Sequence, residues 1–455
     1  MMLYLLLAAC SSTKPDGDFV GTSSPAEDSE VDTTDAGPGI SFDGKRPVNV
    51  LMISWDTTRR DHLGSLDPAG GAETDTIGAL FEGGVVMANH RSCSNWTWAS
   101  TICVQNGQYD FEIGWIPTSH GEYQVPVPDS FLMAGEVLAE QGYQTAMAST
   151  NAWFSSNHNM TQGVTHDEYD NDAEAEWVVD TALGFFEGGA IDPEQPWYVH
   201  AHFMDPHIPY TPPRGYRAAA NALEEVPYDL DKKSGCQELE RDWPELSDEE
   251  RALAMAHLEA LYRGELASAD DQVARLLADL DERGELEDTL VVFWTDHGEQ
   301  LFEHDTIGHG SDLYEAENRA VAAFYSSGIQ PLSWTGPTTH VDIWPTVLDA
   351  LKIPIPEDWT GLPLGERSDH SPRFAMRHDG SSDRIVQFVE RDEIKLIYEW
   401  DGAKALYHLG DDPLEQENRY DPDDPEVIAL WELLMPVVEA TEAVHPDWSP
   451  TAPGP

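Results

Sequence analysis

Two apolar stretches, each followed at once by acidic residues, decide the fold of this chain. Val48-Asn-Val-Leu-Met-Ile-Ser-Trp55 precedes Asp56, and Leu290-Val-Val-Phe-Trp-Thr295 precedes Asp296-His297. Apolar, β-branched runs of this length are typical of buried parallel strands. Ligands of open α/β sheets collect at the carboxyl ends of such strands. We therefore expect both Asp side chains at the same edge of one sheet, although they are far apart in the sequence.

The rest of the chain alternates apolar runs with helical patterns, as βαβ units do. Further strands are predicted at 85–89, 143–149, 197–203 and 321–325. Ser247-Asp-Glu-Glu250 is a capping box that begins a long amphipathic helix ending near residue 280. The Pro-rich, charged segment 212–244 is predicted to be an irregular insertion. The pattern predicts an α/β fold, with a mixed or parallel sheet flanked by helices.

The sequence also predicts four regions. After about residue 371, two short strands (385–389 and 394–400) and a helix (425–439) indicate a small antiparallel sheet plus helix. The expected regions are a lipoprotein-type signal segment at 1–10, a disordered tether at 11–46, the main α/β domain at 47–370 and a C-terminal subdomain at 371–455.

The charge balance excludes several classes of partner. The chain has 25 Lys+Arg against 84 Asp+Glu, a formal net charge of −59. Nucleic-acid binding needs a basic footprint, and an anionic membrane surface would be repelled. Such a surplus is costly by self-repulsion unless salt screens it. We interpret it as an acidic surface suited to a saline environment, although an acidic protein at ordinary ionic strength would fit the composition as well.

The N-terminus indicates export. Leu7-Ala-Ala-Cys10 ends a short apolar run and resembles the bacterial lipobox, whose Cys is lipidated. The run is too short to span a bilayer. The following stretch is rich in Ser, Thr, Asp, Gly and Pro, so it is predicted to be a flexible tether. We expect an exported lipoprotein of the outer membrane, periplasm or cell surface, held to the membrane only by this anchor.

Three further cysteines would then lie in an oxidising compartment. Cys93 and Cys103 bracket Thr97, and a bridge between them would brace that turn and leave Cys236 unpaired. The sequence alone leaves this pairing open, because disulfide geometry depends on the fold.

The residues at the two strand ends suit a cation. Asp56, Asp296 and His297 offer two hard oxygens and one imidazole, a set compatible with Ca²⁺, Mg²⁺, Mn²⁺ or Zn²⁺. Thr97 could add its hydroxyl, since metal coordination makes a hydroxyl nucleophilic. If Thr97 opens a helix, the N-terminal amides would favour a bound anion beside it; serving only as an N-cap is the plainer alternative. Arg59 and Asp61 are interpreted as an internal ion pair.

Five motifs in order carry a family resemblance, and no single one would suffice. They are Asp56-Thr-Thr-Arg-Arg-Asp-His-Leu-Gly64, Asp205-Pro-His-Ile-Pro-Tyr210, Thr295-Asp-His-Gly-Glu299, His340-Val-Asp-Ile-Trp-Pro-Thr-Val-Leu348 and Asp412-Pro-Leu-Glu-Gln-Glu-Asn418. With them the chain resembles the sulfatase family of the alkaline-phosphatase-like superfamily. The resemblance implies the alkaline-phosphatase-like fold, hydrolysis of sulfate or phosphate esters and a metal held by Asp56, Thr97, Asp296 and His297.

The chain departs from the family at the nucleophile. Family sulfatases use C/S-x-P-x-R, whose Cys or Ser becomes formylglycine, followed ten positions later by Gly. Counting back from Gly107 gives Thr97, with Ala99 and Thr101 in place of the Pro and Arg. Threonine carries a β-methyl group and cannot give the aldehyde, so formylglycine is not expected. Related phosphodiesterases and phosphoglycerol-type transferases use an unmodified Thr here.

By the same resemblance, His120, His207 and His309 match positions that contact the nucleophile, substrate or leaving group. Asp205 is expected to bind substrate together with His207 and His309. These last three residues could instead hold a second metal, as in two-metal phosphodiesterases. Because the spacing from Asp205 to His207 is shorter than in those enzymes, one metal is the preferred expectation.

The expected function is an exported, metal-dependent sulfatase-family hydrolase of sulfate or phosphate esters with Thr97 as nucleophile. A phospho-headgroup transferase of the same fold is one alternative. The other is a catalytically degenerate oxyanion-binding protein, suggested by Ala99 and Thr101.

Overall fold

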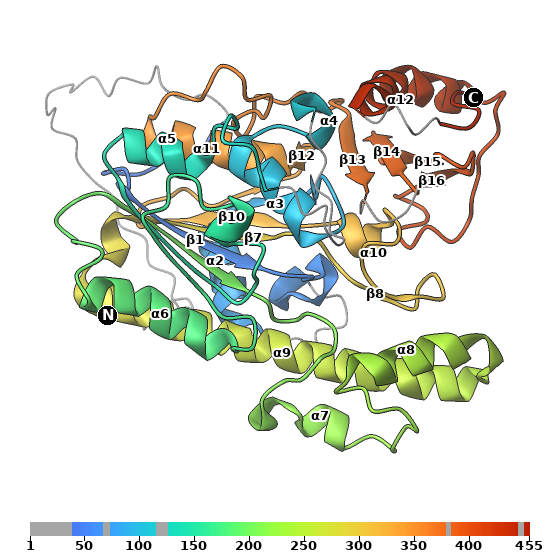
Figure 1. Cartoon of the computed structure of the whole chain (residues 1–455), viewed down its shortest axis with the longest axis horizontal. Coiled ribbons are helices and arrows are strands. Elements are labelled where there is room, and N and C mark those ends of the chain that lie inside the picture. The colour runs from blue at the N-terminus through green and yellow to red at the C-terminus, as the bar shows by residue number, and fades with distance from the viewer. Residues whose placement is uncertain (1–38, 67–72, 115–125, 379–383, 445–449) are drawn as a thin grey trace, which may run out of the picture.

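An eight-stranded mixed sheet forms the centre of the molecule, in the order β11-β2-β10-β7-β1-β6-β4-β5 (Figure 1). The computed structural model describes residues 39–66, 73–114, 126–378, 384–444 and 450–455. The signal segment and residues 11–38 of the expected tether lie outside these residues. The strands are β1 (Asn49–Trp55), β2 (Val85–Met87), β4 (Gln144–Ser149), β5 (His166–Tyr169), β6 (Trp197–Phe203), β7 (Thr289–Thr295), β10 (Ala322–Tyr325) and β11 (Leu332–Trp334).

The strand β1 lies in the middle of the sheet and is fully buried. It pairs in parallel with β7 on one side and β6 on the other, with Trp55 opposite both Thr295 and Phe203. Strand β10 runs antiparallel to β7 and β2, which makes the sheet mixed. Because β1 and β7 are neighbours in register, the residues that follow them, Asp56 and Asp296, emerge side by side. This confirms the sequence expectation for the two strand ends.

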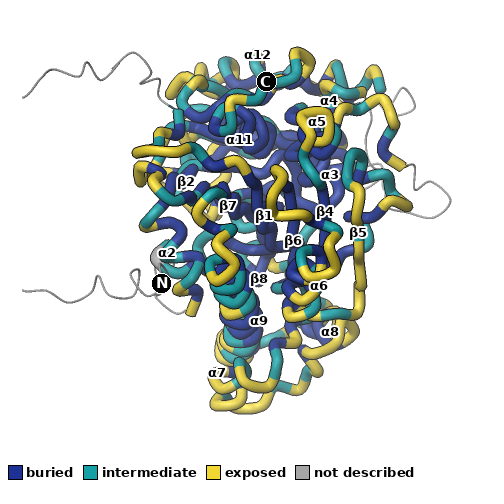
Figure 2. The backbone as a smooth tube through the Cα atoms, turned by 90° about the vertical axis from the view of Figure 1, so that its left-hand side faces the viewer, coloured by how far each residue is buried: buried dark blue, intermediate teal, exposed yellow. Residues whose placement is uncertain are grey.

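Side chains of β1 alternate between two hydrophobic cores, as strand geometry requires. Leu51, Ile53 and Trp55 face a core that includes side chains of the first helical layer, and Val50 and Met52 face the core of the second. Figure 2 shows the sheet as the buried centre between the two layers. The first layer contains α2 (Asp75–Gly83), α6 (Ala175–Glu187) and α9 (Asp248–Arg283), and the second contains α3 (Thr97–Asn106), α5 (Ala134–Glu140) and α11 (Ile343–Leu351).

The strands agree closely with the sequence prediction, but the insertion at 212–244 was predicted wrongly. It contains α7 (Ala218–Asn221) and the ten-residue helix α8 (Lys233–Asp242). Cys236, Leu239 and Trp243 recur at helical spacing and are buried in the first core, so packing overrides the polar, Pro-flanked composition. Within the central sheet, the strands β5 and β11 were not predicted. Both are short, and most of their side chains are exposed or half-buried, which weakens the periodic signal.

A four-stranded antiparallel sheet with a covering helix forms the C-terminal part of the molecule. The antiparallel sheet and the helix were expected, but only its two middle strands were predicted. Two hydrogen bonds to the backbone of Met376 tie this sheet to the turn before α3: Met376 N donates to Cys93 O (3.0 Å), and Ser94 Oγ donates to Met376 O (2.7 Å). Its elements are β13 (Arg373–Arg377), β14 (Val386–Arg391), β15 (Ile394–Glu399), β16 (Lys404–His408) and α12 (Pro425–Val444). No helix within the described residues combines the length and apolar character needed to cross a membrane.

Short elements complete the fold near the carboxyl edge of the main sheet. They are β3 (His90–Arg91) paired with β12 (Thr338–Thr339), β8 (Gln300–Leu301) paired with β9 (Ile307–Gly308), α4 (Asp110–Ile113) and α10 (Glu315–Asn318).

Candidate active site

Asp56, Asp296 and His297 form a buried cluster where β1 and β7 end. Each offers a ligand atom, and these atoms all lie within 4.8 Å of one another. All three side chains are inaccessible to solvent. Within the described parts of the chain, no other group of three His, Cys, Asp or Glu side chains meets this criterion. The sequence expectation that the two strand ends meet is therefore confirmed in space.

Hydrogen bonds hold each of these groups and leave one ligand atom of each without a partner. Asp296 Oδ1 accepts from the amides of Thr57 (3.0 Å) and His297 (2.7 Å). His297 Nδ1 lies 2.9 Å from Gly298 O, so it carries the hydrogen and Nε2 keeps its lone pair. Asp56 Oδ1, Asp296 Oδ2 and His297 Nε2 are buried and have no hydrogen-bond partner, and Nε2 lies 3.7 Å from Asp56 Oδ1 and 3.4 Å from Asp296 Oδ2. Three converging acceptors without donors are the expected state of a cation site.

The electrostatics of the cluster agree with this conclusion. Burial, and then the charge of Asp56, raise the pKa of Asp296 well above its usual range. Burial, and then the positive charge of His309, lower the pKa of His297 to about 3, so its ring is neutral and can donate a lone pair. Two carboxyl groups this close repel each other when both are ionised, and a bound cation would remove that cost. The residues present therefore fit a divalent metal ion.

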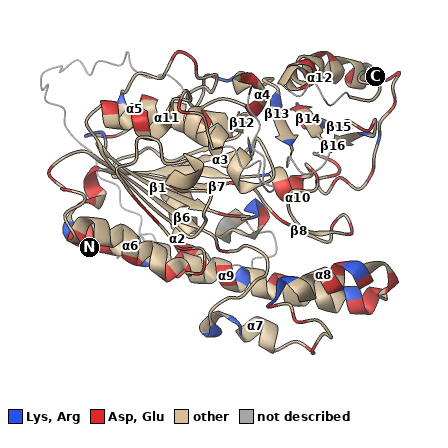
Figure 3. Ribbon diagram, viewed as in Figure 1, with Lys and Arg blue, Asp and Glu red and all other residues tan. Residues whose placement is uncertain are grey.

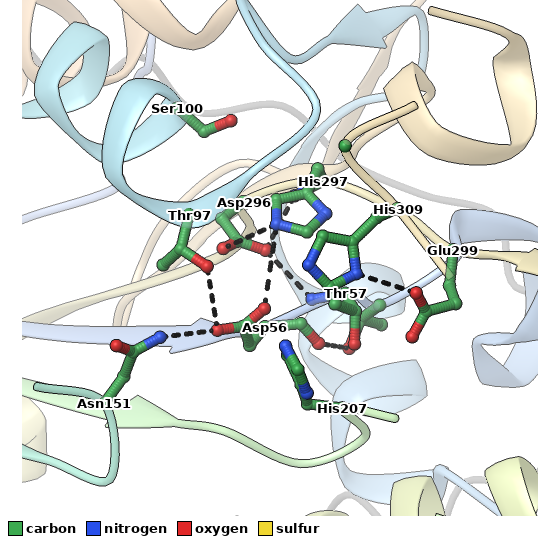
Figure 4. A network of polar contacts seen from close by, with 12 residues as sticks. Asp56, Thr57, Thr97, Ser100, Asn151, His207, Asp296, His297, Glu299 and His309 are labelled. Carbon is green, nitrogen blue, oxygen red and sulfur yellow. Dashed lines mark hydrogen bonds and ion pairs between the residues drawn. The ribbon is translucent and has the colours of Figure 1, made fainter. Parts of the chain in front are cut away.

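Thr97 is the first residue of α3, and its hydroxyl faces the cluster (Figure 4). Thr97 Oγ1 donates to Asp56 Oδ2 at 3.1 Å. The side chain is 4% exposed. Because Thr97 begins a ten-residue helix, the free amides and the positive end of the helix dipole lie beside its hydroxyl. The hydroxyl, the candidate cation ligands and the N-terminus of α3, which favours anions, thus lie next to one another.

A disulfide between Cys93 and Cys103 braces this turn, which resolves the pairing that the sequence left open. Cys236 is a buried free thiol. At the other end of α3, Gly107 adopts a left-handed conformation (φ 62°) that closes the helix, and its carbonyl accepts from the amides of Thr360 and Gly361. Both ends of the helix that carries Thr97 are therefore fixed.

His207 and His309 lie together on the far side of Asp56 from Thr97 (Figure 4). Their ring centroids are 4.9 Å apart, and the His309 ring is 4.6 Å from that of His297. His309 Nδ1 is 2.7 Å from Glu299 Oε1. Although burial opposes its charge, the Glu299 carboxylate raises the pKa of His309. His207 Nδ1 donates to Ile208 O (2.8 Å), and burial lowers its pKa.

Asp205 does not join these two histidines. Its carboxylate takes a hydrogen bond from the amide of Ala175 at the start of α6, and burial, together with Glu174, raises its pKa to about 6. The three side chains expected for a second metal are thus not gathered at one point, and the only metal-type group in the described residues is the Asp56 cluster. His120, the remaining expected site residue, lies outside the described residues.

Two polar residues of the site were missed in the sequence. Asn151 Nδ2 donates to Asp56 Oδ2 at 2.9 Å, and Glu299 holds His309. Asn151 follows the predicted strand 143–149 at the carboxyl edge of the sheet, and this position is the signal that could have found it. The expected pair of Arg59 and Asp61 is confirmed, with Nη2 2.8 Å from Oδ2.

Comparison with known proteins agrees with this geometry. The profile of the family described as Sulfatase matches residues 48–353, which is more than half of the chain. The chain belongs to the sulfatase family. An arylsulfatase from Clostridium perfringens (strain 13 / Type A) is 26% identical over 297 residues, 60% of this chain and 59% of that protein. This sulfatase-family chain thus spans about three fifths of that relative's length.

Other relatives extend over more of the chain. The multifunctional alkaline phosphatase superfamily protein PehA of Trinickia caryophylli is 22% identical, covering 81% of this chain and 82% of that protein. Among solved structures, the putative sulfatase yidJ from Bacteroides fragilis superposes with a TM-score of 0.70 at 17% identity, covering 88% of this chain and 97% of the other. The phosphonate monoester hydrolase SpPMH from Silicibacter pomeroyi gives 0.65 at 20%, with 87% and 96% covered. These structural likenesses establish the alkaline-phosphatase-like sulfatase fold.

Proposed function

We propose that this sulfatase-family protein hydrolyses a sulfate or phosphate-type ester, using the unmodified hydroxyl of Thr97 as nucleophile. The observation that carries the proposal is the position of Thr97 Oγ1, 3.1 Å from a carboxylate oxygen of the metal-type cluster and at the N-terminus of α3. The family relationship supports ester hydrolysis, and the names of the relatives suggest sulfate, phosphate and phosphonate esters as probes.

Each polar residue of the site is assigned a separate role in the proposed reaction. Asp56, Asp296, His297 and Thr97 would hold a divalent ion, which would neutralise ester oxygens and favour the Thr97 alkoxide. Asp56 Oδ2 accepts the hydroxyl hydrogen and so orients Oγ1. The amides at the start of α3 face the ester's negative oxygens. His309, held by Glu299, is the group best placed to give a proton to the leaving oxygen, whereas the neutral His207 offers a lone pair.

The test is turnover by the full chain and three variants. Thr97→Ala should lose at least about a thousandfold in kcat, as removal of a nucleophile does, whereas Thr97→Ser should keep most of the activity. Ser100→Ala is the matched control: it removes a hydroxyl one turn along the same helix, where Ser100 contacts Ser92 rather than the cluster. Substrates are aryl sulfate, phosphate mono- and diesters and a phosphonate monoester, each with Ca²⁺, Mg²⁺, Mn²⁺ or Zn²⁺.

Chelation should abolish turnover, and a single metal should restore it. Full activity in Thr97→Ala would overturn the assignment. If the protein binds metal and sulfate but turns over no ester, the oxyanion-binding alternative holds. Product that appears only with an added alcohol acceptor would instead show a transferase.

We also propose that the protein is an exported lipoprotein, on the basis of Leu7-Ala-Ala-Cys10 and the short apolar run that it ends. Expression in a bacterial host with labelled palmitate should give a lipidated, membrane-associated product. Cys10→Ala should release it. Cytoplasmic, unlabelled wild-type protein would reject this proposal.

A further inference from the structure

A buried chain of polar side chains lies behind Asp56, on the face of the sheet turned toward the second helical layer. Ser54 on β1 stands opposite His202 on β6, and His200 lies two residues earlier on the same face. Ser54 Oγ is 2.7 Å from His200 Nε2 and 2.8 Å from His202 Nδ1. All three side chains are inaccessible to solvent. Three buried polar side chains in the core of a sheet are unusual, because polar groups are costly to bury unless they are hydrogen-bonded.

A hydroxyl that lies between two imidazole nitrogens allows only two arrangements, or orders, of the hydrogens along the chain. Ser54 has a single hydrogen to donate, so it donates to one ring and accepts from the other. In the first order, His200 Nε2–H donates to Ser54, and Ser54 donates to His202 Nδ1. In the second order, both directions are reversed.

The surroundings of the two rings favour the first order. His200 Nδ1 has no partner, and its ring is packed against Phe154, Tyr198 and Trp294. The second order would place an N–H there, and a buried donor without an acceptor costs about 1–3 kcal/mol. It would also turn the bare Nε2 of His202 toward Asp56 Oδ2, which lies 3.6 Å away. The first order instead directs His202 Nε2–H at that oxygen.

We infer that His202 is a positioning residue for Asp56, with its hydrogen fixed on Nε2 by the chain from His200 through Ser54. Asp56 Oδ2 then accepts hydrogen bonds from Thr97 and Asn151 and faces the N–H of His202 at 3.6 Å, an electrostatic contact longer than a hydrogen bond, while Oδ1 has no donor. The carboxylate is thereby held with one oxygen left for a cation. This inference deepens the proposed function, since it assumes that Asp56 binds the metal. Partners of this kind commonly change metal affinity by 10–100-fold.

The hydrogen order can be measured on the metal-free wild-type chain. Selective ¹⁵N-histidine labelling and long-range ¹H–¹⁵N correlation distinguish the two tautomers, with His200→Gln and His202→Gln assigning the two signals by their loss. We expect both rings to carry hydrogen on Nε2. Hydrogen on Nδ1 of either ring would overturn the inference. Ser54→Ala should allow both tautomers of His202 to appear, and an unchanged His202 spectrum in that variant would also contradict the chain.

A pair of substitutions separates positioning from packing. The Gln amide nitrogen reaches the place of Nε2, whereas Asn reaches only that of Nδ1. We expect His202→Gln to bind Mn²⁺ within about threefold of wild type by calorimetry and His202→Asn to bind at least tenfold more weakly. Equal affinity in both, whether normal or weak, would overturn the inference. Wild-type protein that binds no divalent ion would overturn the proposed function instead, and the tautomer measurement would still decide the hydrogen order.

Discussion

Glu317 is a fully buried carboxylic acid close to the site. It accepts from Gln300 Nε2 (2.6 Å), Asn95 Nδ2 (2.8 Å) and the amide of Gly310 (2.9 Å). These donors favour the charged form, but burial outweighs them and raises the pKa of Glu317 to about 8 from an ordinary value of 4.5. Through Asn95 and Gly310, this acid connects the turn before Thr97 to the segment that carries His309.

The raised pKa predicts a pH-dependent stability. Between pH 4.5 and 8 the unfolded chain has lost this proton while the folded chain keeps it, so the free energy of unfolding falls as pH rises through that window, by up to about 1.4 kcal/mol per pH unit. Glu317→Gln cannot titrate, so its stability relative to wild type should rise with pH across the window.

Urea unfolding at pH 5, 6.5 and 8 measures this difference. Glu176→Gln, which changes an exposed carboxylate on α6, is the control and should differ from wild type by a constant amount. A constant difference for Glu317→Gln as well would contradict the prediction.

At the scale of elements, the helix α3 decides whether Thr97 is in place. The disulfide from Cys93 to Cys103 has a sequence separation of ten residues and closes the turn that leads into this helix. A cross-link of this loop size stabilises by about 2–3 kcal/mol by restricting the unfolded chain. The Cys93→Ala/Cys103→Ala variant should therefore lose about that much stability.

The loss should appear as a lower urea midpoint and as reduced ester turnover well below the global transition. Dithiothreitol should reproduce it in wild type and leave the double variant unchanged. Cys236→Ala, which removes the free thiol, should retain the response to dithiothreitol. No response in wild type would mean that the bridge contributes nothing.

At the scale of the whole molecule, one buried lysine joins the C-terminal sheet to the main domain. Lys395 on β15 is inaccessible, and its Nζ lies 2.9 Å from Glu415 Oε1 and 3.2 Å from Glu315 Oε1 on α10. Arg91 on β3 also pairs with Glu315 (2.8 Å). Removing the lysine leaves the buried Glu415 carboxylate without its cation, whereas Glu315 keeps Arg91.

Lys395→Met should therefore cost about 3–5 kcal/mol of stability. Lys45→Met, at an exposed pair with Asp288, should cost less than about 1 kcal/mol. Adding Glu415→Gln to Lys395→Met should recover part of the lost stability, because it removes the buried carboxylate that no longer has a cation beside it. Chemical denaturation of the four proteins tests this, and an unaffected Lys395→Met would contradict it.

The net charge of −59 acts on the molecule as a whole. Figure 3 shows Asp and Glu spread over most helices and loops, with Lys and Arg sparse. Self-repulsion of this surplus falls as ions screen it. The urea midpoint should rise from 0.05 M to 1 M NaCl, and KCl should act equally, because screening does not depend on the identity of the ion. A fall in the midpoint, or an effect of only one salt, would contradict this.

The sequence by itself determined most strands of the central sheet and the metal-type cluster. Apolar runs such as 48–55 and 290–295 signal buried strands, and parallel neighbours bring Asp56 and Asp296-His297 to one edge whatever lies between them. Counting back ten positions from Gly107, as in the family motif, then identified Thr97 as the hydroxyl residue expected beside that edge. These features are local or follow from sheet geometry, so pattern and spacing suffice.

Only the tertiary structure decided the contacts between distant side chains. It showed α8 in the insertion, because burial against the first core outweighs composition. It separated Asp205 from His207, although they are two residues apart, because the turn directs the two side chains differently. It also brought Asn151 and the Ser54–His202 chain to Asp56, since their roles depend on which strands are neighbours and on which face each side chain lies. The end of strand 143–149 could have suggested Asn151 as a site residue, but its contact with Asp56 and the Ser54–His202 chain could not be read from spacing.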